Sequence, residues 1–217
     1  MKEPEIIERT AAHVCELLSS DSSGHDWFHI ERVRRTAVSI AAEERADIFV
    51  VELAALLHDV ADWKFAGGDH EAGPRQARLW LESLAVEPHV VDKVCEIIAG
   101  LSFKGAGVET PMRTLEGQCV QDADRLDAIG AIGVARAFAY GGHKGRALYN
   151  PAIPPTPHDS FEAYKKNQGP TINHFYEKLL VLKDRMSTNA GHRIAAGRHA
   201  FLVQFLAQFL AEWNAER

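Results

Sequence analysis

Apolar residues recur every three or four positions along nearly the whole chain, which is the period of a helix with one buried face. Strand-like alternation never persists for more than a few residues. Residues 48–59 (IFVVELAALLHD) are apolar on almost every side, so we expect a short helix there to run through the core. The pattern predicts an all-α protein with helices near 5–20, 26–45, 48–59, 70–84, 88–100, 118–140, 161–168, 171–187 and 190–214.

One long segment interrupts these helices. Residues 143–160 contain four prolines and little periodicity, which is typical of a loop. Loops of this length are uncommon inside a compact domain and are often lids over a functional site. A lid that returns across a functional site and a plain connector between two helices are both compatible with the sequence.

Composition excludes several classes of protein. A net charge of −6 leaves no uniformly basic face, so we expect no nucleic acid polymer as partner. We find no run of about 18 apolar residues and no apolar stretch of a secretory signal, so we expect neither a membrane span nor export. The three cysteines are scattered and odd in number, as in a reduced, cytoplasmic protein. The length of 217 residues predicts one domain, or one domain with an appendage. Monomer and homodimer are both compatible with the sequence.

Acids and imidazoles gather in three short segments where the surrounding residues are suited to a core. These segments are 25–29 (HDWFH), 58–59 (HD) and 121–127 (QDADRLD). Burying an isolated carboxylate costs several kcal/mol unless it is paired, hydrogen-bonded or bound to a metal. A divalent cation held between helices would compensate all three segments at once.

Each segment also has a plainer interpretation when taken singly. A lone histidine beside an apolar helix is usually a satisfied surface or core residue. Asp122 would serve as the N-cap of the following helix, with Asp124 and Asp127 in an acid-tolerant first turn. It is the combination of the three segments, in this order, that points to a shared site.

The order His29…His58-Asp59…Asp124 resembles that of the HD-domain metal-dependent phosphohydrolases. The runs 25–33 (HDWFHIERV), 56–62 (LLHDVAD) and 122–130 (DADRLDAIG) are similar to those of the small bacterial YpgQ-like branch, and the tail 171–213 resembles it too. The resemblance implies a single HD-type domain over residues 1–217. Its metal-site core would span about 20–140, with C-terminal helices at 161–215 packing on it.

Carried over by position, the resemblance makes His29, His58, Asp59 and Asp124 the metal ligands. A set of two imidazoles and two carboxylates without thiolate favours Mn²⁺ or Mg²⁺, with Fe²⁺, Co²⁺ or Ni²⁺ as alternatives. We expect one ion per chain, because the segment between Asp59 and Asp124 lacks the denser His/Asp motifs of two-metal members. His25 competes with His29 for the ligand role; we favour His29.

The resemblance also suggests catalytic and substrate-binding residues. Asp62 lies one turn after His58 and matches an acidic catalytic residue of nucleotidase relatives; with Asp59 it would transfer protons. The alternative for Asp62 is an acid that only orients His58. Residues expected to bind substrate phosphates are His25, Lys64, Lys104, Arg125, His174 and Lys178.

The function that fits this resemblance best is metal-dependent hydrolysis of a small nucleotide, with a nucleoside triphosphate cleaved to monophosphate and pyrophosphate. The alternatives are a phosphomonoesterase or nucleotidase, and a non-catalytic nucleotide-binding module of the HD type. An intact ligand set favours the enzyme, since a scaffold has no need for four costly buried polar groups.

Overall fold

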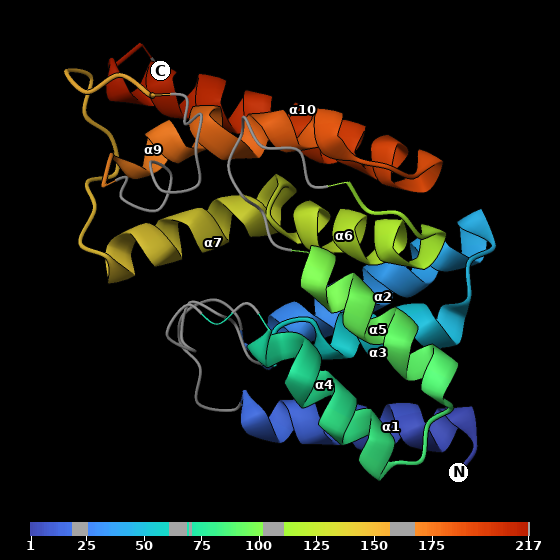
Figure 1. The fold of residues 1–217 in the computed structure, drawn as a ribbon. Coiled ribbons are helices and arrows are strands. Elements are labelled where there is room, and N and C mark those ends of the chain that lie inside the picture. The colour runs from blue at the N-terminus through green and yellow to red at the C-terminus, as the bar shows by residue number, and fades with distance from the viewer. Residues whose placement is uncertain (19–25, 61–68, 70, 102–110, 157–167, 217) are drawn as a thin grey trace. The chain divides into compact units, whose positions relative to one another are not determined.

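A computed structural model describes residues 1–18, 26–60, 69, 71–101, 111–156 and 168–216. All regular structure in these ranges is helical, which confirms the all-α prediction (Figure 1). The described residues up to Asp124 form one compact unit, and those from Arg125 onward form a second.

The first unit is built around α3 (Ile48–Leu57), which contacts α1 (Glu3–Leu17), α2 (Trp27–Glu44) and α5 (Pro88–Gly100). Seven of its ten residues are at most 1% exposed, as the apolar run predicts. The helix α4 (Ala72–Ser83) packs on α5, and most of α6 (Leu115–Asp127) also belongs to this unit. A helix that is buried along most of its length gives its neighbours a fixed support.

Side chains at the helix ends and between helices hold α2 and α3 in place. Asp47 precedes α3, and its Oδ1 accepts hydrogen bonds from the backbone N–H groups of Phe49 at 3.1 Å and Val50 at 3.2 Å. Arg34 of α2 donates through Nε to Oε1 of Glu52 on α3 at 2.8 Å, and its Nη2 lies 2.7 Å from the same oxygen. This ion pair connects the two helices that precede His58 and Asp59 in the chain.

The second unit comprises α7 (Gly130–His143), α9 (Thr171–His174), a π-helical turn η1 (Phe175–Leu179), a 3-10 helix η2 (Leu180–Arg185) and α10 (Asn189–Trp213). Its core is aromatic: Phe138 of α7 lies against Phe175, and Phe175 stacks on Phe205 of α10 with ring centroids 5.6 Å apart. Phe209 of α10 extends this cluster.

Two expected helices differ from the structure. The single helix expected at 118–140 is divided into α6 and α7, because Gly130 has a φ of 77° that a continuing helix cannot use. Arginines close the end of α6: Arg198 donates to the carbonyl of Leu126 at 2.5 Å, and Arg136 donates to the Asp127 carboxylate at 2.6 Å. The expected helix 161–168 lies almost entirely outside the described residues.

The helix expected at 171–187 changes type along its length, from α9 through the π-turn η1 to the 3-10 helix η2. The apolar period is similar in all three, so the sequence pattern alone does not separate them. Buried Glu177 in η1 accepts a hydrogen bond from the Thr156 N–H at 3.0 Å, and Asn173 of α9 donates to the Ile153 carbonyl at 2.9 Å. The described part of the 143–160 segment is therefore anchored to this unit.

Helix α10 is long and apolar enough to pass a length-and-composition test for a membrane span, with an 18-residue window of mean hydropathy 1.2. Core helices pass the same test when they are mostly buried, whereas 17% of this window is buried, so the test is weak evidence either way. The residues of α10 that point inward, Leu202 and Leu206, are buried, and its Phe205 joins the aromatic core. No other helix in the described ranges passes the test.

Candidate metal centre

His29 is the third residue of α2 and is fully buried. The residue before this helix, Asp26, has an extended backbone and serves as the N-cap. Its Oδ1 accepts a hydrogen bond from the backbone N–H of His29 at 2.9 Å. The carboxylate gives this first-turn N–H group a second acceptor beside the Asp26 carbonyl oxygen, which lies 3.0 Å from the His29 nitrogen. The first turn of α2 is thereby fixed at the residue that carries the imidazole.

His58 directly follows α3, with a ring that is 3% exposed. Its Nδ1 lies 2.8 Å from the carbonyl oxygen of Ala55. Because a carbonyl oxygen only accepts, Nδ1 must carry the proton in this contact, and Nε2 then presents a lone pair. The next residue, Asp59, places its carboxylate on the same side as that lone pair.

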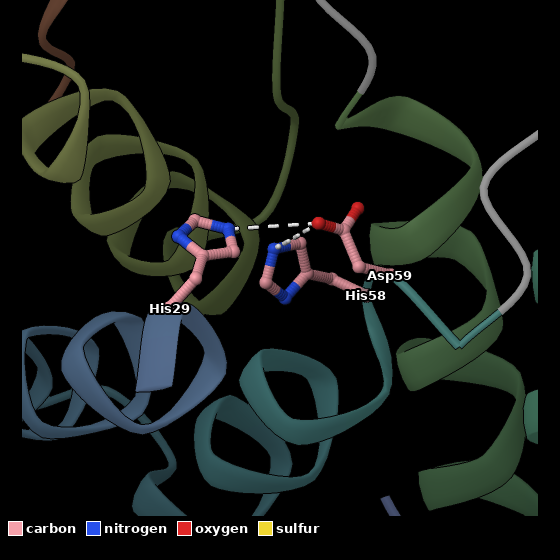
Figure 2. Close-up of side chains that lie close together, drawn as sticks. All are labelled: His29, His58 and Asp59. Atoms are coloured by element: carbon pink, nitrogen blue, oxygen red, sulfur yellow. Dashed lines mark ion pairs between the residues drawn. The ribbon is translucent and has the colours of Figure 1, made fainter. Parts of the chain in front are cut away.

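Four ligand atoms converge from the ends of three helices. Nε2 of His29 and Nε2 of His58 each lie 3.5 Å from Oδ2 of Asp59, and Figure 2 shows both rings directed at this one oxygen. Asp124, in the last turn of α6, brings Oδ1 to 3.5 Å from Nε2 of His29 and 3.9 Å from Nε2 of His58. These four nitrogen–oxygen distances are longer than the roughly 2.7 to 3.2 Å of a good hydrogen bond.

The spacing and chemistry of these atoms fit a divalent cation. Ligand atoms about 2.1 Å from one ion lie roughly 3 to 4 Å from one another. Each imidazole Nε2 lies 3.5 to 3.9 Å from an oxygen of Asp59 and from an oxygen of Asp124, which is within that range. Nε2 of His58 is buried and has no hydrogen-bond partner among the described residues, which is costly for a polar atom unless something else occupies its lone pair. A cation would satisfy it and would also offset the repulsion between the two carboxylates.

The helix ends add to the electrostatics of this cluster. His58 and Asp59 lie at the carboxyl end of α3, and Asp124 lies in the last turn of α6. Carbonyl groups at such ends carry partial negative charge that favours a cation. The amino end of α2 at His29 has the opposite sign, and the Asp26 carboxylate offsets it there.

Comparisons with known proteins agree with this arrangement. The family model described as "HD domain" matches residues 27–129. The YpgQ protein of Bacillus subtilis is 40% identical over 215 residues, which cover 95% of this chain and 93% of that protein. The chain belongs to the HD-domain family of metal-dependent phosphohydrolases. HD domains bind divalent metals, and the His29, His58 and Asp59 group is a site of that kind.

Solved structures of HD relatives share the fold. The crystal structure of an HD-superfamily hydrolase from Bacillus thuringiensis has a TM-score of 0.78 at 47% identity and covers 99% of this chain and 100% of its own. Bacillus subtilis YpgQ in complex with ADP gives a TM-score of 0.78 at 35% identity, covering 98% and 96% of the two chains. The similarity therefore extends over the whole chain and beyond the matched HD segment.

The remaining predicted site residues fall into two groups. His25, Asp62, Lys64 and Lys104 lie outside the described residues. Arg125, His174 and Lys178 belong to the second unit, where an Arg125 Nη1 donates to the carbonyl of Arg185. Their roles toward substrate stay predictions.

Two alternatives from the sequence can now be assigned. Asp122 is not an N-cap, because α6 already begins at Leu115; it is fully buried in the body of this HD-domain helix. Asp127 forms an ion pair with Arg136 at 2.6 Å. Burial, reinforced by the Asp122 carboxylate, raises the pKa of the Cys119 thiol to about 12.

Two groups that hold the histidines were not expected from the sequence. The Asp26 carboxylate accepts from the backbone of His29, and the Ala55 carbonyl contacts the ring of His58. An aspartate directly before a helix is a recognised N-cap signal, so the role of Asp26 was accessible from the sequence. The Ala55 carbonyl carries no such signal, because any residue supplies a backbone oxygen.

Proposed function

We propose that this HD-domain protein hydrolyses a phosphoanhydride bond in a small nucleotide, cleaving a nucleoside triphosphate to the monophosphate and pyrophosphate. The observation that carries the proposal is the convergence of two imidazole nitrogens and two carboxylate oxygens at 3.5 to 3.9 Å. A nucleotide as ligand is supported by the relative YpgQ, whose crystal structure is a complex with ADP.

In this proposal His29, His58, Asp59 and Asp124 hold one divalent cation. The mixed nitrogen and oxygen donors favour Mn²⁺ or Mg²⁺, and Fe²⁺, Co²⁺ and Ni²⁺ fit the same donors. Bound there, the cation supplies Lewis acidity that makes water a better nucleophile and neutralises charge on a phosphoryl oxygen. The side-chain exposure of Asp124, 37%, against 0% for His29, leaves the carboxylate side of the cluster as the side from which a phosphate enters.

The chain's own residues would perform the binding and the proton transfers. The Ala55 carbonyl holds His58 in the tautomer with a free Nε2. Asp59 and Asp62 would accept and return the proton of the attacking water, a contribution typically worth about 10²- to 10⁴-fold in rate. Cationic and imidazole side chains would bind the phosphates: His25, Lys64, Lys104, Arg125, His174 and Lys178.

A nucleotide panel tests this function directly. The purified protein is incubated with ribo- and deoxyribonucleoside mono-, di- and triphosphates in Mn²⁺, and pyrophosphate and orthophosphate are measured separately. We expect pyrophosphate in equal amount to monophosphate from triphosphates. Orthophosphate from monophosphates would instead indicate a phosphomonoesterase, and binding without either product would indicate a nucleotide-binding module.

A further inference from the structure

Asp26 accepts hydrogen bonds from the backbone of the first turn of α2, two of its three bonds being to His29. Its Oδ1 accepts from the His29 N–H at 2.9 Å, and its carbonyl oxygen accepts from the same N–H at 3.0 Å. The Asp26 carbonyl also accepts from the Ile30 N–H at 3.3 Å. The backbone of Asp26 is extended, with φ of −77° and ψ of 172°, as an N-cap requires. Asp26 thus caps the beginning of α2 and also holds the backbone amide of His29.

Because His29 lies in the first turn of α2, the cap affects the position of its imidazole as well as the stability of the helix. The first turn of a helix has unsatisfied N–H groups and frays most readily. His29 lies in that turn, yet its ring is fully buried and its Nε2 must stay 3.5 Å from oxygens of both Asp59 and Asp124. Opening the turn would rotate the Cα–Cβ bond of His29 and move its ring away from those oxygens.

We propose that Asp26 is a positioning residue for the metal centre, acting through the His29 backbone. The inference rests on the proposed metal site. The Asp26 carboxylate stabilises the first turn of α2, and other acids transfer protons. Metal affinity should then depend on a hydrogen-bond acceptor at position 26 more than on a negative charge there.

The chain supplies a matched control in Asp47. It is the N-cap of α3, and its Oδ1 accepts from the backbone N–H groups of Phe49 and Val50. His58 follows the opposite end of this ten-residue helix, roughly 15 Å away at 1.5 Å per residue. Removing either cap weakens one helix, but only Asp26 bonds to a proposed ligand residue.

The experiment uses full-length protein with Asp26→Ala, Asp26→Asn, Asp47→Ala or Asp47→Asn. Mn²⁺ affinity is measured by titration calorimetry, and the melting temperature is measured in chelator. We expect Asp26→Ala to weaken Mn²⁺ binding roughly 5- to 30-fold, the equivalent of a lost N-cap. Asp26→Asn, which keeps an acceptor without the charge, should stay within about 3-fold of wild type. Asp47→Ala should lower the melting temperature but leave Mn²⁺ affinity within about 3-fold.

The inference is overturned if Asp26→Ala loses no more Mn²⁺ affinity than Asp47→Ala, or if Asp26→Asn loses as much as Asp26→Ala. Should Asp26→Ala fail to fold, Asp26→Gly replaces it, because glycine at an N-cap costs little stability and also lacks the acceptor. Wild-type protein that binds no divalent cation would refute the metal site itself, and the positioning role with it. Wild-type binding with equal affinities in all variants refutes only the role of Asp26.

Discussion

Nε2 of His58 lies 3.9 Å from Oδ1 of Asp124, although the two residues are 66 positions apart and belong to α3's carboxyl end and to α6. The imidazole is buried, and the carboxylate is partly exposed. Because Nδ1 is turned to Ala55, the ring presents an unpartnered nitrogen to an acid that it does not hydrogen-bond. This is the arrangement expected of two ligands of one cation.

Asp62 gives the first prediction, since it is the acid proposed to move protons without binding metal. Asp62→Asn keeps the size of the side chain and removes its charge. We expect kcat to fall at least about 100-fold with Mn²⁺ affinity unchanged. Asp69→Asn is the control, because Asp69 forms an exposed ion pair with Arg75 at 2.6 Å. Activity near that of wild type in Asp62→Asn would make Asp62 structural.

The Arg34–Glu52 ion pair connects α2 to α3, the helices that carry His29 and His58. A double-mutant cycle with Arg34→Ala and Glu52→Ala should give a coupling energy of about 1 kcal/mol in unfolding, near the upper end for pairs of this exposure. Each single variant should also weaken Mn²⁺ binding. The more exposed pair Arg78–Asp92, between α4 and α5, is the control and should leave Mn²⁺ binding unchanged. Equal effects from both pairs would contradict a link to the metal centre.

The 143–160 segment is predicted to affect both substrate binding and stability. Shortening residues 150–158 to a Gly/Ser link removes the groups that bond to Asn173 and Glu177, which are buried. The loss of these two hydrogen bonds costs about 0.5 to 1.5 kcal/mol each, so the melting temperature should fall. If the segment is also a lid, KM for a nucleoside triphosphate rises. A lower melting temperature with unchanged KM would identify a connector.

His13 should make stability sensitive to mild acid. Its ring stacks on Trp80 with centroids 3.7 Å apart, and burial lowers the pKa of His13 from its usual 6.5, more than Glu16 raises it. As pH falls below 6.5, His13 binds a proton more readily in the unfolded chain than in the folded protein, where its pKa is lower. The free energy of unfolding therefore decreases as pH drops. Relative to His13→Phe, the wild-type melting temperature should decline further between pH 7.5 and pH 5.5. A constant difference across that range would contradict the prediction.

Much of the fold could be predicted because helical periodicity is a local property. The core helix α3 follows directly from the run at 48–59. The break between α6 and α7 could not, because it depends on the positive φ of Gly130 and on arginines that reach the end of α6 from elsewhere in the chain. The same holds for η1, where Glu177 bonds to a residue 21 positions away.

The candidate site was predictable to the extent that its order along the chain identifies the family. His29, His58 and Asp59 form one group that could hold a metal ion, and an oxygen of Asp124 lies 3.5 Å from Nε2 of His29; the ligand role of all four stays a prediction. What the pattern does not contain is how each ring is oriented, because that depends on backbone groups such as the carbonyl of Ala55 and on the capping bond of Asp26.

Mn²⁺ binding tests most directly whether four side chains hold one cation. The four are His29, His58, Asp59 and Asp124. Titration calorimetry on wild-type protein, His58→Gln and Asp124→Asn gives stoichiometry and affinity, and circular dichroism checks that each variant is folded. We predict one ion per chain in the wild type and affinity reduced at least about 100-fold in both variants, because each removes a ligand and not merely a group that supports one. Full Mn²⁺ occupancy in either folded variant, or two ions per wild-type chain, would contradict the account.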